Sequence, residues 1–216
     1  MRISVDAVLF DIDGTLVDST GAVERTWRLW GEAHGIDPDE ILAVSHGRRS
    51  EDTIALFLPE EQVAEAAAEL EELELADLDG VTALPATREL LTALPSRRWG
   101  AVTSGSRRLM RTRLEAAGLP VPEVLVTADD VTKGKPHPQG YLRAAAALGF
   151  DPARCLVVED APAGIRAGLA SGAAVLAVAT SHGRTELEGL GATELIDNLT
   201  FCALETTRGE LVLSTP

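Results

Sequence analysis

Val5-Asp-Ala-Val-Leu-Phe10 is followed at once by Asp11-Ile-Asp13-Gly-Thr15, close to the start of the chain. A short apolar run that ends at acidic residues and a glycine is typical of a buried β-strand. The strand therefore ends at Asp11, and Asp11 and Asp13 carry two carboxylates at its carboxyl end. Taken alone, these acids could equally belong to a solvated turn, so their meaning depends on the other strand ends.

From about residue 82 onward, apolar runs alternate with amphipathic stretches. We expect strands at 99–103, 124–127, 155–158, 174–178 and near 194–196, and helices at 86–94, 106–117, 138–148 and 162–170. Strands that alternate with helices indicate a parallel sheet covered on both faces. The last ten or so residues carry no comparable pattern, and we expect them to be poorly tied down.

Residues 20–78 carry only helical patterns. We expect helices at 20–34, 38–44, 50–57 and 59–78, and no strand signal interrupts them. The predicted fold is α/β. A doubly wound, Rossmann-like parallel-sheet core is formed by residues 1–16 and 82–216, and a small all-helical cap, residues 17–81, is inserted after the first strand.

Composition limits the kinds of partner. The 216 residues carry a formal net charge of −15, and a chain this acidic repels nucleic acid and anionic membranes at long range. No apolar run is long enough to span a bilayer, and the N-terminus lacks a signal-peptide pattern. Two distant cysteines fit a reducing compartment. We expect a cytoplasmic protein that binds neither nucleic acid nor membrane, with a monomer as the default for a capped chain this small.

Three further segments should meet the first strand end. Thr103-Ser104-Gly105-Ser106 opens a helix, where hydroxyl and free N–H groups can hold an anion. The segment Lys133-Gly-Lys135-Pro-His-Pro138 is stiffened by two prolines after its second lysine. Another strand ends at Glu159-Asp160. Ligands of open α/β sheets bind outside the carboxyl ends of the strands, which is where these groups lie.

Together these groups suit phosphoryl transfer. Acids at two strand ends offer the hard oxygen ligands that Mg²⁺ prefers. One carboxylate can attack phosphorus while a second protonates the leaving alcohol and then activates water. A lysine and a hydroxyl can neutralise the phosphoryl oxygens. Without local positive charge, an acidic protein would repel a phosphorylated substrate.

The motifs resemble those of the haloacid dehalogenase superfamily. Asp11-Ile-Asp13-Gly-Thr15, Ser104, Lys135 in Gly-Lys-Pro and Glu159-Asp160 match its four motifs in order and spacing over nearly the whole chain. The second acid, Asp13, is typical of its phosphotransferases. Finer signatures resemble the sugar-phosphate and glycerol-phosphate phosphatase subgroup that includes 2-deoxyglucose-6-phosphate phosphatase. They are His46-Gly-Arg-Arg-Ser-Glu-Asp-Thr53, Gly134-Lys-Pro-His-Pro138 and Glu159-Asp-Ala-Pro-Ala-Gly-Ile165.

The resemblance implies a role for each position. Asp11 would be the nucleophile and a Mg²⁺ ligand, and Asp13 the general acid and base, with its backbone carbonyl on the metal. Asp160 would be a side-chain metal ligand, supported by Glu159. The phosphoryl group would be held by Ser104, Gly105 and Lys135. One departure from the family is Ala86, which follows Pro85 at the cap exit where glycine is common.

The predicted activity is Mg²⁺-dependent hydrolysis of a small phosphorylated metabolite through a phospho-aspartyl intermediate on Asp11. Arg48 and Arg49 lie in a turn of the acidic cap and could present a guanidinium to the substrate when the cap closes. A solvated basic turn is the alternative for both.

Other functions remain open at this point. A phosphomutase of the β-phosphoglucomutase type resembles the chain in core and cap. A phospho-accepting receiver module also uses acids, a hydroxyl and a lysine, but is shorter and uncapped. A binding protein without catalysis would not need acids at positions 11, 13 and 160.

Overall fold

The computed structural model describes residues 2–207 and 210–215. Its centre is a six-stranded sheet in which each neighbouring pair of strands is parallel, in the order β6-β5-β2-β7-β8-β9. The strands are β2 (Ala7–Phe10), β5 (Trp99–Val102), β6 (Leu125–Val126), β7 (Cys155–Glu159), β8 (Ala174–Val178) and β9 (Glu194–Ile196). Each of these strands was predicted, so the parallel α/β core is confirmed.

Helices cover both faces of this sheet. Alternate residues of β2 point to opposite faces, as the pleat requires. Val8 and Phe10 pack in a cluster with α5 and α6, whereas Ala7 and Leu9 pack in another cluster with α7 and α8. The helices are α5 (Thr87–Ala93), α6 (Arg107–Ala116), α7 (Gln139–Leu148), α8 (Pro162–Ala170) and α9 (Arg184–Leu187), with 3-10 turns at Ser96–Arg98, Ala128–Asp130, Pro152–Arg154 and Leu199–Phe201. The sheet is therefore doubly wound.

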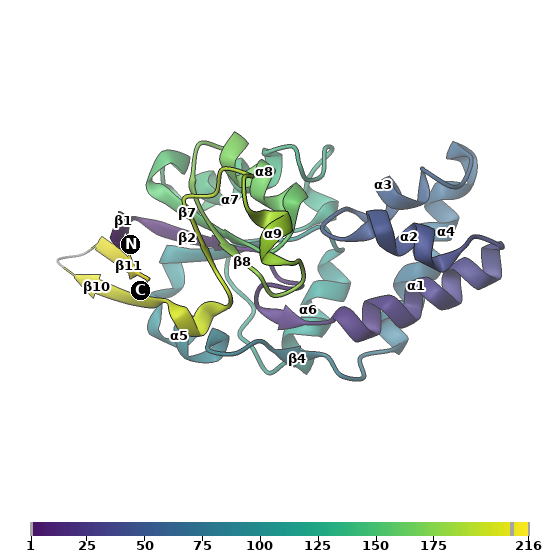
Figure 1. Cartoon of the computed structure of the whole chain (residues 1–216), viewed down its shortest axis with the longest axis horizontal. Helices are drawn as coiled ribbons and strands as arrows, with labels where there is room; N and C mark the ends of the chain where they lie inside the picture. The colour runs from purple at the N-terminus through teal and green to yellow at the C-terminus, as the bar shows by residue number, and fades with distance from the viewer. Residues whose placement is uncertain (1, 208–209, 216) are drawn as a thin grey trace.

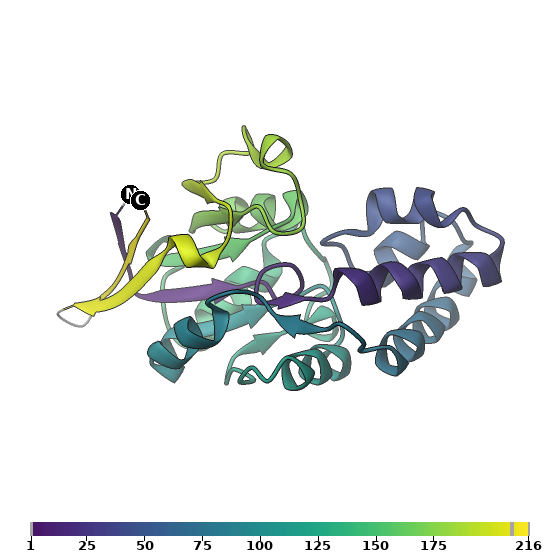
Figure 2. The same ribbon diagram turned by 60° about the horizontal axis from the view of Figure 1, so that its bottom comes forward.

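Four helices form a separate layer beyond the carboxyl ends of the strands (Figure 2). They are α1 (Thr20–His34), α2 (Pro38–Ser45), α3 (Ser50–Ile54) and α4 (Glu60–Ala76). Their apolar faces form a cluster of their own around Trp27, Trp30 and Leu70, so the helical insert has its own small core. Both connections to it run through a two-stranded antiparallel ribbon, β3 (Val17–Asp18) with β4 (Thr82–Ala83). No helix among the described residues is both apolar enough and long enough to cross a bilayer.

A second, antiparallel sheet corrects one prediction. It consists of β1 (Arg2–Val5), β11 (Glu210–Ser214) and β10 (Ala203–Thr207), and lies at the opposite end of the molecule from the four helices (Figure 1). The prediction that the last ten or so residues are poorly tied down is wrong for β11, which pairs with β1 and β10 and buries Leu211 and Leu213. Residues 208, 209 and 216 of that segment lie outside the described residues. The predicted first strand is also divided, because Val5 ends β1 and Ala7 begins β2.

Ala86, at the start of α5, has a left-handed backbone with φ of 66°. This region costs an L-residue about 1–2 kcal/mol, whereas glycine adopts it freely. We expect Ala86→Gly to raise the free energy of unfolding by roughly 1 kcal/mol, measured as a higher Tm. The matched control is Ala146→Gly on the exposed face of α7, where glycine should lower it by about 0.5–1 kcal/mol. If both substitutions changed the free energy of unfolding in the same direction, this account would be contradicted.

Candidate active site

The predicted site residues converge because their strands are neighbours. β2 lies between β5 and β7, and Phe10 is in register with Ala101 on one side and Val158 on the other. The residues that follow these strands therefore reach the same edge of the sheet. Asp11 continues the ladder, since its backbone N–H donates to the carbonyl of Val158 at 3.0 Å.

A buried lysine connects two of the acids. Lys135 Nζ donates to Asp11 Oδ1 and to Glu159 Oε1, each at 2.5 Å. Glu159 is fully engaged, because it also accepts from the Tyr141 hydroxyl at 2.7 Å and from the backbone N–H groups of Asp160 and Ala161. The lysine is therefore positioned by Glu159. The second carboxylate oxygen of Asp11 accepts no hydrogen bond from the described residues.

Asp160 lies beside Asp11 and is oriented by two hydroxyls. Thr15 Oγ1 donates to its Oδ1 at 2.9 Å, and the Ser181 hydroxyl donates to Oδ2. Gly14, with φ of 83°, leaves room for this carboxylate, because a Cβ there would lie 2.1 Å from Asp160 Oδ2. The Asp160 side chain is thus packed into a place that only a glycine neighbour allows.

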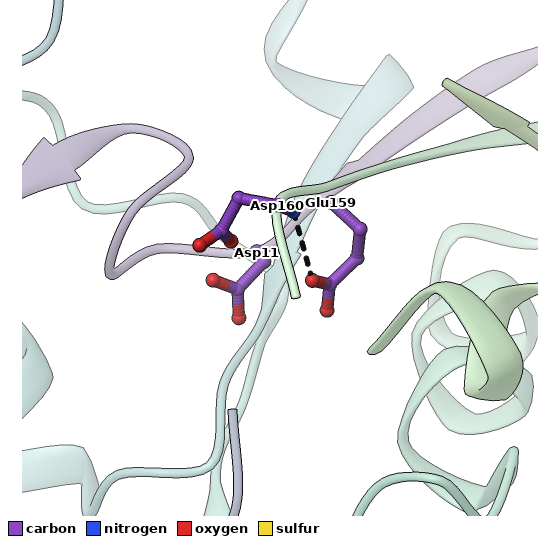
Figure 3. Close-up of side chains that lie close together, drawn as sticks. All are labelled: Asp11, Glu159 and Asp160. Carbon is purple, nitrogen blue, oxygen red and sulfur yellow. Dashed lines mark hydrogen bonds between the residues drawn. The ribbon is translucent and has the colours of Figure 1, made fainter. Parts of the chain in front are cut away.

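Asp11, Glu159 and Asp160 each offer a carboxylate oxygen within 4.8 Å of the others, and all three residues are buried. Figure 3 shows the Asp11 and Asp160 carboxylates close together, with the Glu159 carboxylate on the other side of the strand end. Buried carboxylates this close need a compensating cation, and Lys135 supplies only one positive charge. The donor set consists of hard oxygen atoms and fits a divalent cation such as Mg²⁺.

Burial shapes the protonation of this group. Desolvation, followed by the Coulomb effect of Glu159, raises the pKa of Asp160 to about 7. Desolvation also raises the pKa of Asp11 well above its ordinary value, although Lys135 opposes the shift. The pKa of Lys135 is raised, because Asp11 and Glu159 outweigh its own desolvation. The lysine therefore stays charged. A further cation would stabilise the charged forms of the two aspartates, which burial disfavours.

Ser104 and Gly105 line a cavity of about 260 Å³ between the four helices and the sheet. The helical side of the cavity includes Trp27, Arg48 and Glu71. Ser104 Oγ donates to the backbone carbonyl of Gly47 in the helical insert at 2.9 Å. The insert and the core are therefore in contact next to the predicted phosphoryl cradle.

The two predicted arginines differ in their contacts. Arg49 forms a bidentate pair with Asp52 at 2.7 and 2.6 Å. It also lies against Gly134, the neighbour of Lys135, because a Cβ atom added to this glycine would be 2.8 Å from Arg49 Nε. Arg48 lines the same cavity, and no ion pair involves it within residues 2–207 and 210–215. Both guanidinium groups thus belong to the helical side of the site, with Arg48 the less neutralised.

The hydrogen-bond partners of the Asp13 carboxylate lie outside the cluster of Asp11, Glu159 and Asp160. Its Oδ1 accepts from Ser19 Oγ at 2.7 Å, and its Oδ2 accepts from an N–H of Arg113 at 2.8 Å. The Asp13 side chain is 28% exposed, so it reaches solvent. Of the three aspartates predicted to bind the metal, Asp13 is the one whose carboxylate lies outside the group of oxygens within 4.8 Å of one another.

Sequence reasoning missed several residues that hold these groups. Tyr141 and Ser181 contact acids of the buried cluster, and Ser19 and Arg113 contact Asp13. Tyr141 is one of the few aromatic residues and follows the Gly-Lys-Pro segment closely, which is a usable signal. No pattern in the sequence distinguishes Arg113 from the other arginines of α6.

Comparisons with known proteins identify the family of this chain. The model of the haloacid dehalogenase-like hydrolase family matches residues 5–172. The chain is a member of this family, and the resemblance predicted from its motifs is confirmed.

Named relatives extend along most of the chain. Hexitol phosphatase A of Escherichia coli is 49% identical over 79% of this chain and 81% of its own length. 2-Deoxyglucose-6-phosphate phosphatase 2 of Saccharomyces cerevisiae is 37% identical over 92% and 90%. A crystal structure of a hydrolase from Pseudomonas syringae superposes with a TM-score of 0.81 at 26% identity, covering 89% of this chain and 94% of that one.

Proposed function

We propose that this chain is a Mg²⁺-dependent phosphatase of small sugar or polyol phosphates that forms a phospho-aspartyl intermediate on Asp11. The family and the two phosphatase relatives support hydrolysis of a phosphate monoester as the reaction. The observation that carries the covalent step is the buried Asp11 carboxylate, held 2.5 Å from Lys135 and beside Asp160. A phosphomutase is not favoured, because both named relatives are phosphatases.

In the first step, a carboxylate oxygen of Asp11 attacks phosphorus, and the bond between phosphorus and the ester oxygen breaks. The leaving alkoxide takes a proton from the Asp13 carboxyl group and departs as the alcohol. Lys135, Ser104 and the N–H groups near Gly105 would hold the phosphoryl oxygens, so that their charge is neutralised as the bond breaks.

In the second step, the Asp13 carboxylate takes a proton from water, and the water oxygen attacks phosphorus. The bond between Asp11 and phosphorus breaks, which releases inorganic phosphate and restores the Asp11 carboxylate. Asp13 is protonated again, so it is ready for the next alcohol. Neither step needs another reactant.

Mg²⁺ would be held by the side chains of Asp11 and Asp160 and by the Asp13 carbonyl, with Glu159 kept in place by Lys135 and Tyr141. When bound, the ion neutralises the acids and polarises the phosphoryl group. Activity should therefore vanish in excess chelator and return with added Mg²⁺.

Metal binding should also depend on pH. The pKa of Asp160 is raised to about 7 from 3.8. At a pH between these values, Asp160 keeps its proton in the folded metal-free protein and has lost it in the unfolded chain. Stability without metal therefore falls as pH rises from 4 toward 7, and Mg²⁺ must displace that proton below 7. We expect the Mg²⁺-induced rise in Tm to be larger at about pH 8 than at about pH 5.5. Asp160→Asn should weaken this pH dependence without abolishing it, because burial also raises the pKa of Asp11. An equal rise in Tm at both pH values in the wild-type protein would contradict the prediction.

The helical insert would act as a cap that closes over the substrate. Arg48 faces the cavity without an ion pair among the described residues, so it is best placed to meet the substrate. A charge-assisted bidentate contact contributes roughly 1.5–3 kcal/mol, so Arg48→Ala should lower kcat/KM about 10- to 150-fold on a polyol phosphate. Arg49→Ala should cost less, because Asp52 already neutralises Arg49.

Several controls accompany this prediction. Arg48→Lys should restore activity only partly, since an ammonium lacks the planar fork. An aryl phosphate that makes no use of the cap should show little loss. Arg28→Ala removes an exposed cap arginine paired with Asp39 and should change nothing. If Arg48→Ala lowered kcat/KM mildly and equally on both substrates, Arg48 would be a solvated turn residue that does not contact the substrate.

The substrate class is tested by phosphate release from a panel of sugar and polyol phosphates, with phosphoserine and a phosphopeptide for comparison. Hexitol and hexose phosphates should be hydrolysed fastest. Release from none of the panel, with Mg²⁺ present and the protein folded, would refute the proposed function.

A further inference from the structure

Arg113 of α6 joins the Asp13 carboxylate to the helical cap. Its side chain is 3% exposed, and its two terminal N–H groups donate to Asp13 Oδ2 at 2.8 Å and to Glu74 Oε1 at 2.9 Å. Its Nε is buried without a hydrogen-bond partner among the described residues. The guanidinium is thus held by two acids that come from different parts of the molecule.

Glu74 belongs to the cap helix α4 and is itself buried. Desolvation raises the pKa of Glu74, whereas the Arg113 guanidinium opposes that shift. A buried carboxylate and a buried guanidinium are each costly alone, so each keeps the other in place. The position of Arg113 therefore depends on where α4 sits.

Asp13 is held at both oxygens, by Arg113 on one side and by Ser19 on the other. Ser19 is the N-cap residue of α1, at the entry to the cap. Asp13, which transfers protons in the proposed mechanism, is thus held by two residues. Arg113 belongs to the core and contacts the cap, and Ser19 lies on the connection into the cap. Both contacts change if the cap moves relative to the core.

Two more polar contacts show that α4 lies along α6. Glu71 Oε1 accepts from Ser106 Oγ, and Glu72 pairs with Arg108, each at 2.5 Å. The side chains of Arg108 and Glu72 are 62% and 65% exposed, and neither contacts Asp13. This pair has the same chemistry on the same two helices but no connection to the site, so it serves as a matched control.

We propose that Arg113 is a positioning residue for Asp13 and that Glu74 couples its position to the cap. When α4 is docked on α6, the arrangement fixes the plane of the Asp13 carboxylate. When the cap moves away, Glu74 withdraws and Arg113 is left with a single acid. The inference rests on the proposed function, because it assigns proton transfer to Asp13.

The test uses phosphate monoesters whose alcohols differ in acidity, from dinitrophenyl phosphate to an alkyl phosphate such as glycerol phosphate. A poor leaving group needs a proton from Asp13, whereas a good one does not, and kcat/KM reports this first step. Asp13→Asn should steepen the dependence on leaving-group pKa. Arg113→Met should steepen it in the same direction, with a loss of about 10²-fold on the alkyl phosphate and only a few-fold on the dinitrophenyl ester.

Graded variants separate positioning from general damage. Arg113→Lys should recover part of the loss, because an ammonium can contact Asp13 but cannot bridge both acids. Glu74→Leu should steepen the dependence, and Glu74→Gln should do so less, because its amide oxygen still accepts from Arg113. Arg108→Ala should match the wild-type protein on every ester.

The leaving-group dependence is a property of the active molecules, so a reduced folded fraction does not alter it. If Arg113→Met is insoluble, the test rests on whether Glu74→Leu steepens the dependence of kcat/KM on leaving-group pKa. The inference would be overturned if the Arg113 and Glu74 variants lowered kcat/KM by the same factor on all esters, or did not lower it at all. Failure of the proposed function looks different: the wild-type protein would hydrolyse none of the esters, or Asp13→Asn would leave the dependence unchanged.

Discussion

Asp11→Asn should abolish turnover, with a loss on the order of 10⁴-fold or more in kcat. The amide is a poor nucleophile, and nothing else in the described cluster can take its place. Glu159 is engaged by Lys135, Tyr141 and two backbone N–H groups. Asp160 is held at both oxygens by the hydroxyls of Thr15 and Ser181.

The fold should survive this substitution. Burial raises the pKa of Asp11, which means that its charge is costly, and Asn removes that charge while keeping the shape. Lys135 retains its contact with Glu159. We therefore expect an unchanged circular dichroism spectrum and a Tm that is equal or higher. Asp39→Asn, the same chemical change at an exposed cap position, should leave turnover unaffected. Near wild-type rates in Asp11→Asn would rule out the covalent mechanism.

Asp13→Asn should lower kcat about 10²- to 10⁴-fold through lost proton transfer. Its effect should differ in kind from that of Asp11→Asn, because the nucleophile is intact. With an aryl phosphate of low leaving-group pKa, the first step should proceed and the second should stall, so phosphoenzyme accumulates. Rapid-quench measurement of the first turnover should show a burst of released phenol followed by slow turnover.

Ser19→Ala is the graded comparison for this prediction. It removes one hydrogen bond to Asp13 but leaves Arg113, so the loss should be roughly 2- to 13-fold, as expected for a contribution of about 0.5–1.5 kcal/mol. A loss in Asp13→Asn no greater than that in Ser19→Ala would contradict the role of Asp13 in proton transfer.

The parallel core could be predicted from sequence because each strand ends in a recognisable way. Asp11 and Glu159 follow runs of buried residues, and parallel strands bring their carboxyl ends to one edge. The helices of the cap were predictable for a similar reason. Trp27 and Trp30 in α1, and Ala66 and Leu70 in α4, recur at helical spacing and belong to one buried cluster. These features are local in the sequence, so a pattern can reveal them.

The antiparallel sheet and the Arg113 bridge were not predictable in the same way. β1 and β11 come from opposite ends of the chain, and pairing between them leaves little local trace beyond the apolar run of Leu211 to Leu213. Arg113 meets residues 39 and 100 positions away, and its neighbours in α6 include other arginines that face solvent. Only the packing of α4 on α6 distinguishes the buried arginine from the exposed ones.

The most direct test of the account is to trap the phosphoryl group on the protein. Asp13→Asn would be mixed with an aryl phosphate and Mg²⁺, quenched in acid within the first turnover and analysed by peptide mass spectrometry. The account predicts one added phosphoryl group on the peptide that carries Asp11, and none when Asp11 is also replaced by Asn. Release of phenol without any phosphorylated peptide, or a phosphoryl group on a residue other than Asp11, would contradict it.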